Sequence, residues 1–153
     1  MLRDVKKIFS IFHDGGISDV KLNHGVLELK VEISYLAQAI NPSYSAFELL
    51  IEGVSNLRFS TWQNDPNEKA QVLNDPAEIF LPELEILEGN IKGHEVEVVC
   101  NQADPAFSYC GGELLFSAVS VRVKDQGGSV CSIDDLSEIC KNYWAAFSNK
   151  SKA

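Results

Sequence analysis

The first candidate catalytic residues in the chain are an adjacent histidine and aspartate, His13 and Asp14. A His-Asp pair is typical of metal-dependent hydrolases, in which further histidines converge on the same ion. The other two histidines are His24 and His94, and none of the three has a metal-ligand spacing. We therefore interpret the pair as the end of a helix, where its polar groups bond free backbone groups. Gly15-Gly16 would supply the left-handed cap.

Cysteine chemistry is the second possibility. Cys100, Cys110, Cys131 and Cys140 show no C-x-x-C spacing. Since no export signal is apparent, reduced thiols are favoured over disulfides. Cys110 lies beside two glycines that would expose it, and His94 is the candidate base. This pair defines one alternative function, a small enzyme or small-ligand binder with a pocket near both residues. The alternative interpretation of Cys110 is an ordinary loop or buried thiol.

The sequence contains no G-x-S-x-G, G-x-G-x-x-G or phosphate-loop motif. We therefore assign no catalytic residue, no metal ligand and no cofactor.

The charge distribution is more specific than any of these motifs. The chain of 153 residues has a formal net charge of −9. Residues 65–104 hold ten acidic residues and two basic ones, a net charge of −8. Such a field repels phosphate backbones and anionic lipids and attracts cationic partners. The charge therefore argues against nucleic-acid and membrane binding, and it favours a basic protein partner.

Four of these acids lie on two predicted strands. Glu83 and Glu85 are on the first strand, and Glu95 and Glu97 are on the second. A hairpin of these strands would place many of the carboxylates on one face, where like charges opposite each other cost stability. Three explanations stay open: a basic partner, a divalent cation, or a solvated face that promotes solubility. Trp62 falls on the polar side of its strand and, if exposed, is a candidate contact residue. These five residues are the predicted binding site.

The elements that would position these residues follow from periodicity. Apolar residues three and four apart predict a helix over residues 2–12. Alternating patterns predict strands over 17–22, 27–33, 47–51, 57–61, 79–87 and 94–100, with 113–124 as the longest candidate. Residues 63–76 are polar and are predicted to be a loop. Ser132 would cap a C-terminal helix with an apolar stripe from Ile133 to Phe147.

These elements predict a single α+β domain over residues 1–153. Its curved, mostly antiparallel sheet has six or more strands, and the N-terminal and C-terminal helices pack on it. No apolar run reaches the ~20 residues of a membrane span, and the N-terminus lacks the features of a signal peptide. We therefore expect a cytoplasmic protein. An edge strand or an apolar sheet face also leaves a homodimer open.

The first 60 residues resemble a family. Phe-His-Asp at 12–14 precedes ISDV at 17–20, LELKVEI at 27–33 and FELLIEGVSNLRF at 47–59. This pattern is similar to small bacterial immunity-type proteins that neutralise secreted toxins, and to related families of unknown function. The matching motifs are short and structural, so no functional residue is carried over. The resemblance implies a non-enzymatic binder, and an acidic middle segment suits toxins that are basic nucleases. We therefore expect a bacterial protein that binds a basic partner.

Overall fold

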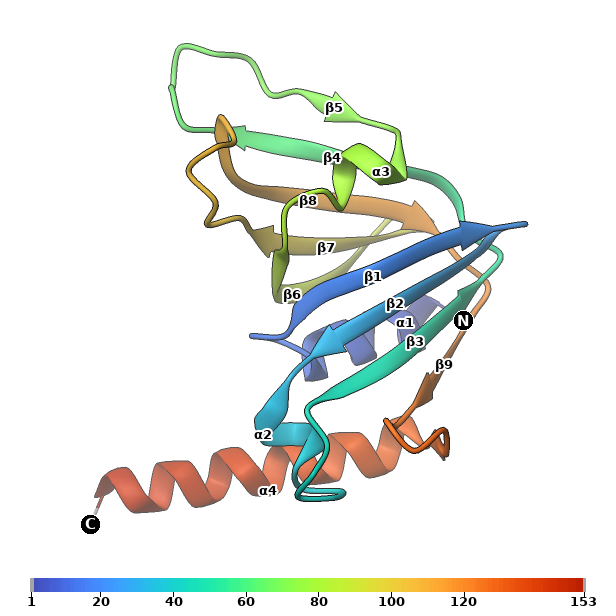
Figure 1. Cartoon of the computed structure of the whole chain (residues 1–153), viewed down its shortest axis with the longest axis vertical. Helices are drawn as coiled ribbons and strands as arrows, with labels where there is room; N and C mark the ends of the chain where they lie inside the picture. Colours follow the sequence, from blue (N-terminus) through green and yellow to red (C-terminus); the bar gives the residue numbers. More distant parts are fainter. Residues whose placement is uncertain (1, 153) are drawn as a thin grey trace.

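The computed structural model describes residues 2–152, and within them ten strands form one antiparallel sheet (Figure 1). The strand order is β10-β9-β3-β2-β1-β6-β7-β8-β4-β5. The first five of these in space are β10 (Val130–Cys131), β9 (Ser120–Lys124), β3 (Ala46–Glu52), β2 (Val26–Glu32) and β1 (Gly16–Asn23). The other five are β6 (Leu84–Lys92), β7 (Glu95–Asn101), β8 (Tyr109–Ser117), β4 (Ser55–Gln63) and β5 (Val72–Leu73). The predicted α+β class with a curved antiparallel sheet is confirmed.

The two halves of the sheet meet at a short seam between β1 and β6. In this pairing, Gly16 is opposite Glu85 and Ile17 is opposite Leu84. Two backbone hydrogen bonds extend the seam, from Asp14 N to Ile86 O (2.7 Å) and from Ile86 N to Gly15 O (2.8 Å). The seam therefore lies directly after the His13-Asp14-Gly15-Gly16 turn.

Helix α1 (Leu2–Ile11) covers the inner face of the sheet, which carries the buried side chains. Phe9 meets Phe116 of β8 edge-on at 6.2 Å between ring centroids, and Phe12 stacks on Phe47 of β3 at 5.0 Å. Helix α1 and the residue that follows it thus tie both halves of the sheet into a single core. The alternation predicted for 27–33 is confirmed, because Leu27, Leu29 and Val31 are buried.

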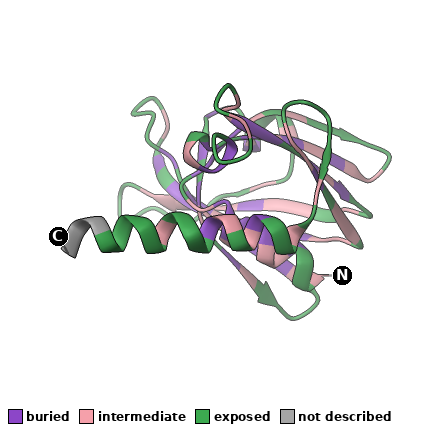
Figure 2. Ribbon diagram, turned by 90° about the horizontal axis from the view of Figure 1, so that it is seen from below, coloured by how far each residue is buried: buried purple, intermediate pink, exposed green. Residues whose placement is uncertain are grey.

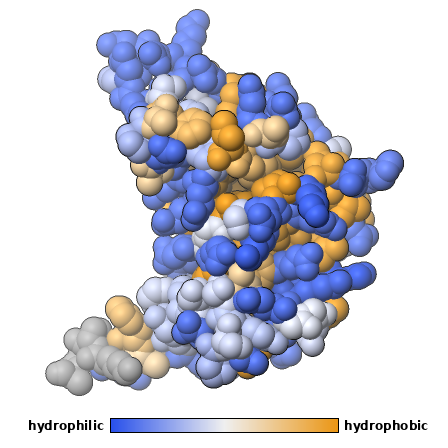
Figure 3. All heavy atoms as spheres, in the orientation of Figure 1, coloured by the Kyte–Doolittle hydropathy of each residue, from blue (hydrophilic) through white to orange (hydrophobic). Residues whose placement is uncertain are grey.

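The sequence-based prediction needs correction in three places. The candidate strand over 113–124 is two strands, because the chain leaves β8 after Ser117 and crosses to the other half of the sheet as β9. The candidate strand over 79–87 begins at Leu84, after the helical turn α3 (Pro76–Ile79). The predicted loop over 63–76 contains the short strand β5, which pairs with β4. The loop itself forms the hydrophilic top of the molecule in Figure 3.

The first helix ends differently from the predicted glycine cap. The left-handed residue is Asp14, with a φ of 71°, rather than Gly15 or Gly16. Gly15 instead allows the backbone to pass close to Val31 of β2, since a Cβ at this position would stand 2.6 Å from Val31 Cγ1. His13 Nδ1 lies 2.9 Å from Ser10 O, as expected for a helix end.

The C-terminal helix α4 (Ile133–Lys152) packs against α1 and α2 (Ser34–Ala37). Its predicted cap is confirmed, because the Asp135 N–H donates to Ser132 Oγ at 3.3 Å. Leu136 is buried, whereas Phe147 is 55% exposed, and residues 145–149 all belong to the exposed part of the helix (Figure 2). No helix in residues 2–152 combines the length and apolarity that a membrane crossing requires.

Candidate functional site

The predicted hairpin exists as β6 and β7, and its outer face, opposite α1, is the acidic face. A register shift between Ile86 and Glu88 adds one residue to β6 and sets which residues face each other. The register places each of four acids opposite a residue of another kind: Glu85 with Asn101, Glu88 with Val99, Glu97 with Asn90 and Glu95 with Lys92. The like-charge opposition expected from the sequence is therefore absent from this hairpin.

Glu95 is held by a cation from a neighbouring part of the sheet. Arg58 of β4 donates from Nη1 to Oε2 at 2.7 Å and from Nη2 to Oε1 at 2.9 Å. Asn56 adds a third hydrogen bond, 3.2 Å from Oε2. The hydrogen bonds from Arg58 lower the pKa of Glu95, because they favour the ionised carboxylate. Glu95 thus has its charge partner within the chain.

Glu97 is similarly satisfied. Glu97 is 6% exposed, and its Oε2 lies 2.6 Å from Lys92 Nζ. Hydrogen bonding to Glu97 raises the pKa of Lys92. The side-chain amide of Asn90 lies between Glu88 and Glu97 and donates to both. The two acids at this end of the hairpin therefore belong to internal ion pairs.

The other end of the hairpin differs, because its acids line an open recess of about 510 Å³. The acidic recess is formed by Glu83, Glu85, Asn101, Gln102, Ala103, Asp104 and Cys110. No Lys or Arg is among these lining residues, and among the side chains of residues 2–149 neither Glu83 nor Glu85 takes part in an ion pair. Their charges are therefore available to a partner.

A braced loop forms one wall of the acidic recess. Gln102, 6% exposed, donates from Nε2 to Tyr109 O at 2.8 Å and to Asp104 O at 3.0 Å. Its Oε1 accepts a hydrogen bond from Asp104 N. Buried amides that satisfy several backbone groups hold loops in one conformation. Sequence reasoning did not identify Gln102 or Asp104 as site residues, since a glutamine ahead of an Asp-Pro turn carries no distinctive pattern.

Trp62 lies at the same end of the sheet as the acidic recess. Its ring packs over Gly111, where a Cβ would stand 3.1 Å from Cε3. Gly111 pairs with Asn101, and Asn101 pairs with Glu85. Cys110 Sγ contacts Trp62 O at 3.6 Å. The five predicted residues thus divide into Trp62, Glu83 and Glu85 at the recess end and Glu95 and Glu97 at the far end of the hairpin.

The His94 and Cys110 pair does not share a cleft. The His94 carbonyl accepts from Ser117 Oγ, at the last residue of β8. Cys110 lies at the opposite end of that strand, beside Trp62. A strand rises ~3.3 Å per residue, so roughly 20 Å separate the two ends. His94 therefore cannot act as the base for Cys110.

The histidine near the start of the chain and the cysteines, which were the other candidate groups, lie among packing contacts or are free thiols. The His13 ring stacks on Trp144 at 5.4 Å between centroids. All four cysteines are free thiols, and burial raises the pKa of Cys100 to about 12. Within residues 2–152, no three His, Cys, Asp or Glu side chains are grouped so that they could hold a metal ion.

Comparisons with known proteins give no relative of this chain. No family model matches it, and no curated protein or solved structure matches it significantly.

Proposed function

We propose that the protein is a non-enzymatic binder of a basic protein partner, and that the acidic recess receives a Lys or Arg side chain of that partner. The observation that carries the proposal is the set of unpaired carboxylates at one end of the β6–β7 hairpin. Glu83 and Glu85 face a recess with no cationic lining residue. Asp104, on the braced loop, adds a third carboxylate.

Electrostatics support this choice of end. A cation that approached Glu95 or Glu97 would compete with Arg58 and Lys92, which already hold those carboxylates. The acidic recess has no lining Lys or Arg with which an incoming cation would compete. The net charge of −9 would steer a basic partner toward the protein, and Trp62 offers an aromatic contact near the recess.

The resemblance of the first 60 residues to immunity-type proteins suggests the kind of partner. We propose a basic bacterial toxin, for which charge complementarity supplies fast and selective association. In this function the protein acts by occupying the partner's surface, so it needs no catalytic group.

The experiment is a pull-down from bacterial lysate with mass spectrometry, paired with calorimetric titration of a hexa-arginine peptide. The recess variant is the double charge reversal Glu83→Lys/Glu85→Lys. The matched control is Glu52→Lys/Glu138→Lys, which changes the net charge equally at exposed acids away from the recess. Basic proteins retained at low salt by the wild type and the control, and lost by the recess variant and at high salt, are expected. Equal loss in both variants, or retention that ignores salt, would contradict the proposal.

A further inference from the structure

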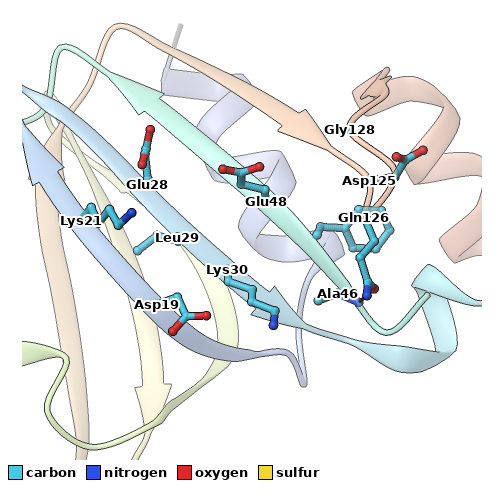
Figure 4. Close-up of a pocket in the computed structure, with 11 residues that line it drawn as sticks. Asp19, Lys21, Glu28, Leu29, Lys30, Ala46, Glu48, Asp125, Gln126 and Gly128 are labelled. Carbon is cyan, nitrogen blue, oxygen red and sulfur yellow. Dashed lines mark hydrogen bonds between the residues drawn. The ribbon is translucent and has the colours of Figure 1, made fainter. Parts of the chain in front are cut away.

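A second pocket lies on the outer face of the other half of the sheet, away from the acidic recess. It has a volume of about 310 Å³, within the range of small-molecule sites. Its floor is the backbone of β2 and β3 at Leu29 and Phe47, whose side chains point into the core and are 1% exposed. Figure 4 shows charged side chains from three strands around this floor. We call it the strand pocket.

One wall of the strand pocket is a turn fixed by several hydrogen bonds. Gln126 Oε1 accepts from the backbone N–H groups of Ser45 (2.7 Å) and Ala46 (3.2 Å). Asp125 Oδ1 accepts from Gly127 N at 2.9 Å and from Ser129 N at 3.0 Å. The turn is thus docked on β3 and internally bonded. A preformed wall lowers the entropy that a ligand would lose in ordering it.

Opposite charges in the strand pocket face each other across neighbouring strands without forming ion pairs across them. Lys21 is directly opposite Glu28, and Lys30 is directly opposite Glu48. Cross-strand neighbours have Cβ atoms ~5 Å apart and usually interact. Yet within residues 2–152 neither pair forms an ion pair, and Lys30 bonds Glu32 of its own strand at 3.2 Å instead. In the view of Figure 4, the carboxylates of Glu28 and Glu48 lie above the ammonium groups.

This separation of charge selects a ligand that carries both signs. A simple cation would meet Lys21 and Lys30, and a simple anion would meet Glu28 and Glu48. Asp19 and Asp125 add two further acids to the lining, so the strand pocket as a whole favours a ligand of net positive charge. A small molecule with a carboxylate, an ammonium group and a second cationic group satisfies all these conditions.

We propose that the strand pocket binds a free basic α-amino acid. Its carboxylate lies at Lys21 and at Lys30, where it takes the place of the exposed Glu32 as the partner of the Lys30 ammonium group. Its own ammonium group lies at Glu28 and Glu48. Its cationic side chain extends toward Asp125 or toward Asp19, which lie on opposite sides of the strand pocket (Figure 4). The proposal is independent of the acidic recess and of the proposed protein partner, because no lining residue is shared.

The test is titration of the ¹⁵N-labelled protein with L-arginine, agmatine and Nα-acetyl-L-arginine, followed by NMR. Agmatine lacks the carboxylate and the acetylated compound lacks the ammonium group. We expect L-arginine to shift the amides of residues 28–30, 46–48 and 126–128, and to bind at least 3-fold more tightly than either analogue. Agmatine carries more positive charge than arginine, so equal or tighter binding of agmatine means non-specific attraction and overturns the proposal.

Two variants complete the test. Glu48→Gln and Lys30→Gln should each weaken arginine binding about 3-fold or more, since each removes one of the paired contacts. Glu52→Gln, on the same strand and the same face as Glu48 but outside the strand pocket, should leave the affinity unchanged. A thermal melt of each variant establishes that it is folded. Absence of shifts in these amides at 10-fold molar excess and above, or equal affinities in all three variants, would overturn the proposal.

Discussion

At the scale of single residues, the same residue type has two different roles on one hairpin. Glu95 and Glu97 are held by Arg58 and Lys92, whereas Glu83 and Glu85 have no cationic partner within the described residues. The difference arises from register, because β4 brings Arg58 to one end of the hairpin only. The role of an acidic residue therefore depends on which residues the fold places beside it, and the sequence alone does not give these neighbours.

Replacing Glu95 should produce a pH-dependent loss of stability. Arg58 lowers the pKa of Glu95 below its ordinary value of 4.5, so the folded protein keeps this carboxylate ionised at a lower pH than the unfolded chain does. The contribution is complete above the ordinary pKa and is lost as the pH falls through the lowered, folded-state pKa. We expect Glu95→Gln to lower the free energy of unfolding by about 1 kcal/mol at neutral pH, and by less in acid. Urea denaturation at several pH values measures this.

The partner and a control make the cycle complete. Arg58→Met should lose a similar amount, and the double variant should lose less than the sum of the two, because the pair is removed once. Glu52→Gln, an exposed acid, should change little at any pH. Additive losses, or a Glu95→Gln effect that persists unchanged in acid, would show that the ion pair does not supply this stability.

The candidate site was predictable from the sequence only in part. Charge counting located the acidic segment, and alternation predicted that many of its carboxylates share one face of a hairpin. Arg58 lies 37 residues from Glu95, and no local pattern joins them. Likewise, Asp104 reaches the acidic recess because the Gln102 side chain braces a loop by bonding the backbone of Asp104 and Tyr109, and periodicity does not report such side-chain bonds.

At the scale of elements, α4 shows where a sequence pattern extends beyond its structural use. The apolar stripe continues to Phe147, but burial decreases along the helix: Leu136 is 1% exposed and Phe147 is 55% exposed. Tyr143 stacks on Tyr35 at 4.4 Å, where the helix passes α2. Helical periodicity indicates which side of a helix is apolar, whereas the positions of its neighbours determine how much of that side is covered.

Two truncations on this stripe should therefore differ sharply. Leu136→Ala creates a cavity in the core and should cost about 2–4 kcal/mol of unfolding free energy. Phe147→Ala removes a mostly exposed ring and should cost less than about 0.5 kcal/mol. Both substitutions keep the helix propensity high, so the comparison isolates burial. Guanidinium denaturation measures both values, and equal losses would mean that the far end of α4 is packed in solution.

The elements themselves were largely predictable, and the connections between them were not. Alternation identified β2 and β3 within one or two residues, because each has one buried face. It merged β8 and β9, since the apolar residues 114–116 are followed, with no Gly or Pro between, by the alternating Val119, Val121 and Val123. The break at Ala118 and Val119 exists because the chain changes partners there, from β4 and β7 to β3 and β10. Strand pairing between distant segments is a property of the whole sheet.

At the scale of the whole molecule, the unequal distribution of charge should affect stability itself. The net charge is −9, and most of the excess negative charge falls in residues 65–104. These residues form α3 and the strands β5, β6 and β7, which belong to the second half of the sheet. A compact fold brings these like charges together, and the unfolded chain separates them. Internal ion pairs such as Arg58–Glu95 and Lys92–Glu97 offset part of this repulsion.

Added salt should therefore raise the melting temperature. The Debye length shrinks from about 30 Å at 0.01 M salt to about 8 Å at 0.15 M, so long-range repulsion is screened before contacts such as the 2.6 Å Lys92–Glu97 pair. We expect an increase of a few degrees in NaCl, followed by circular dichroism. Glu83→Gln/Glu85→Gln reduces the repulsion directly, so this variant should melt higher than the wild type at low salt and converge with it at high salt. A melting temperature that falls with NaCl would mean that the ion pairs, rather than the excess of carboxylates, dominate the electrostatic free energy of the fold.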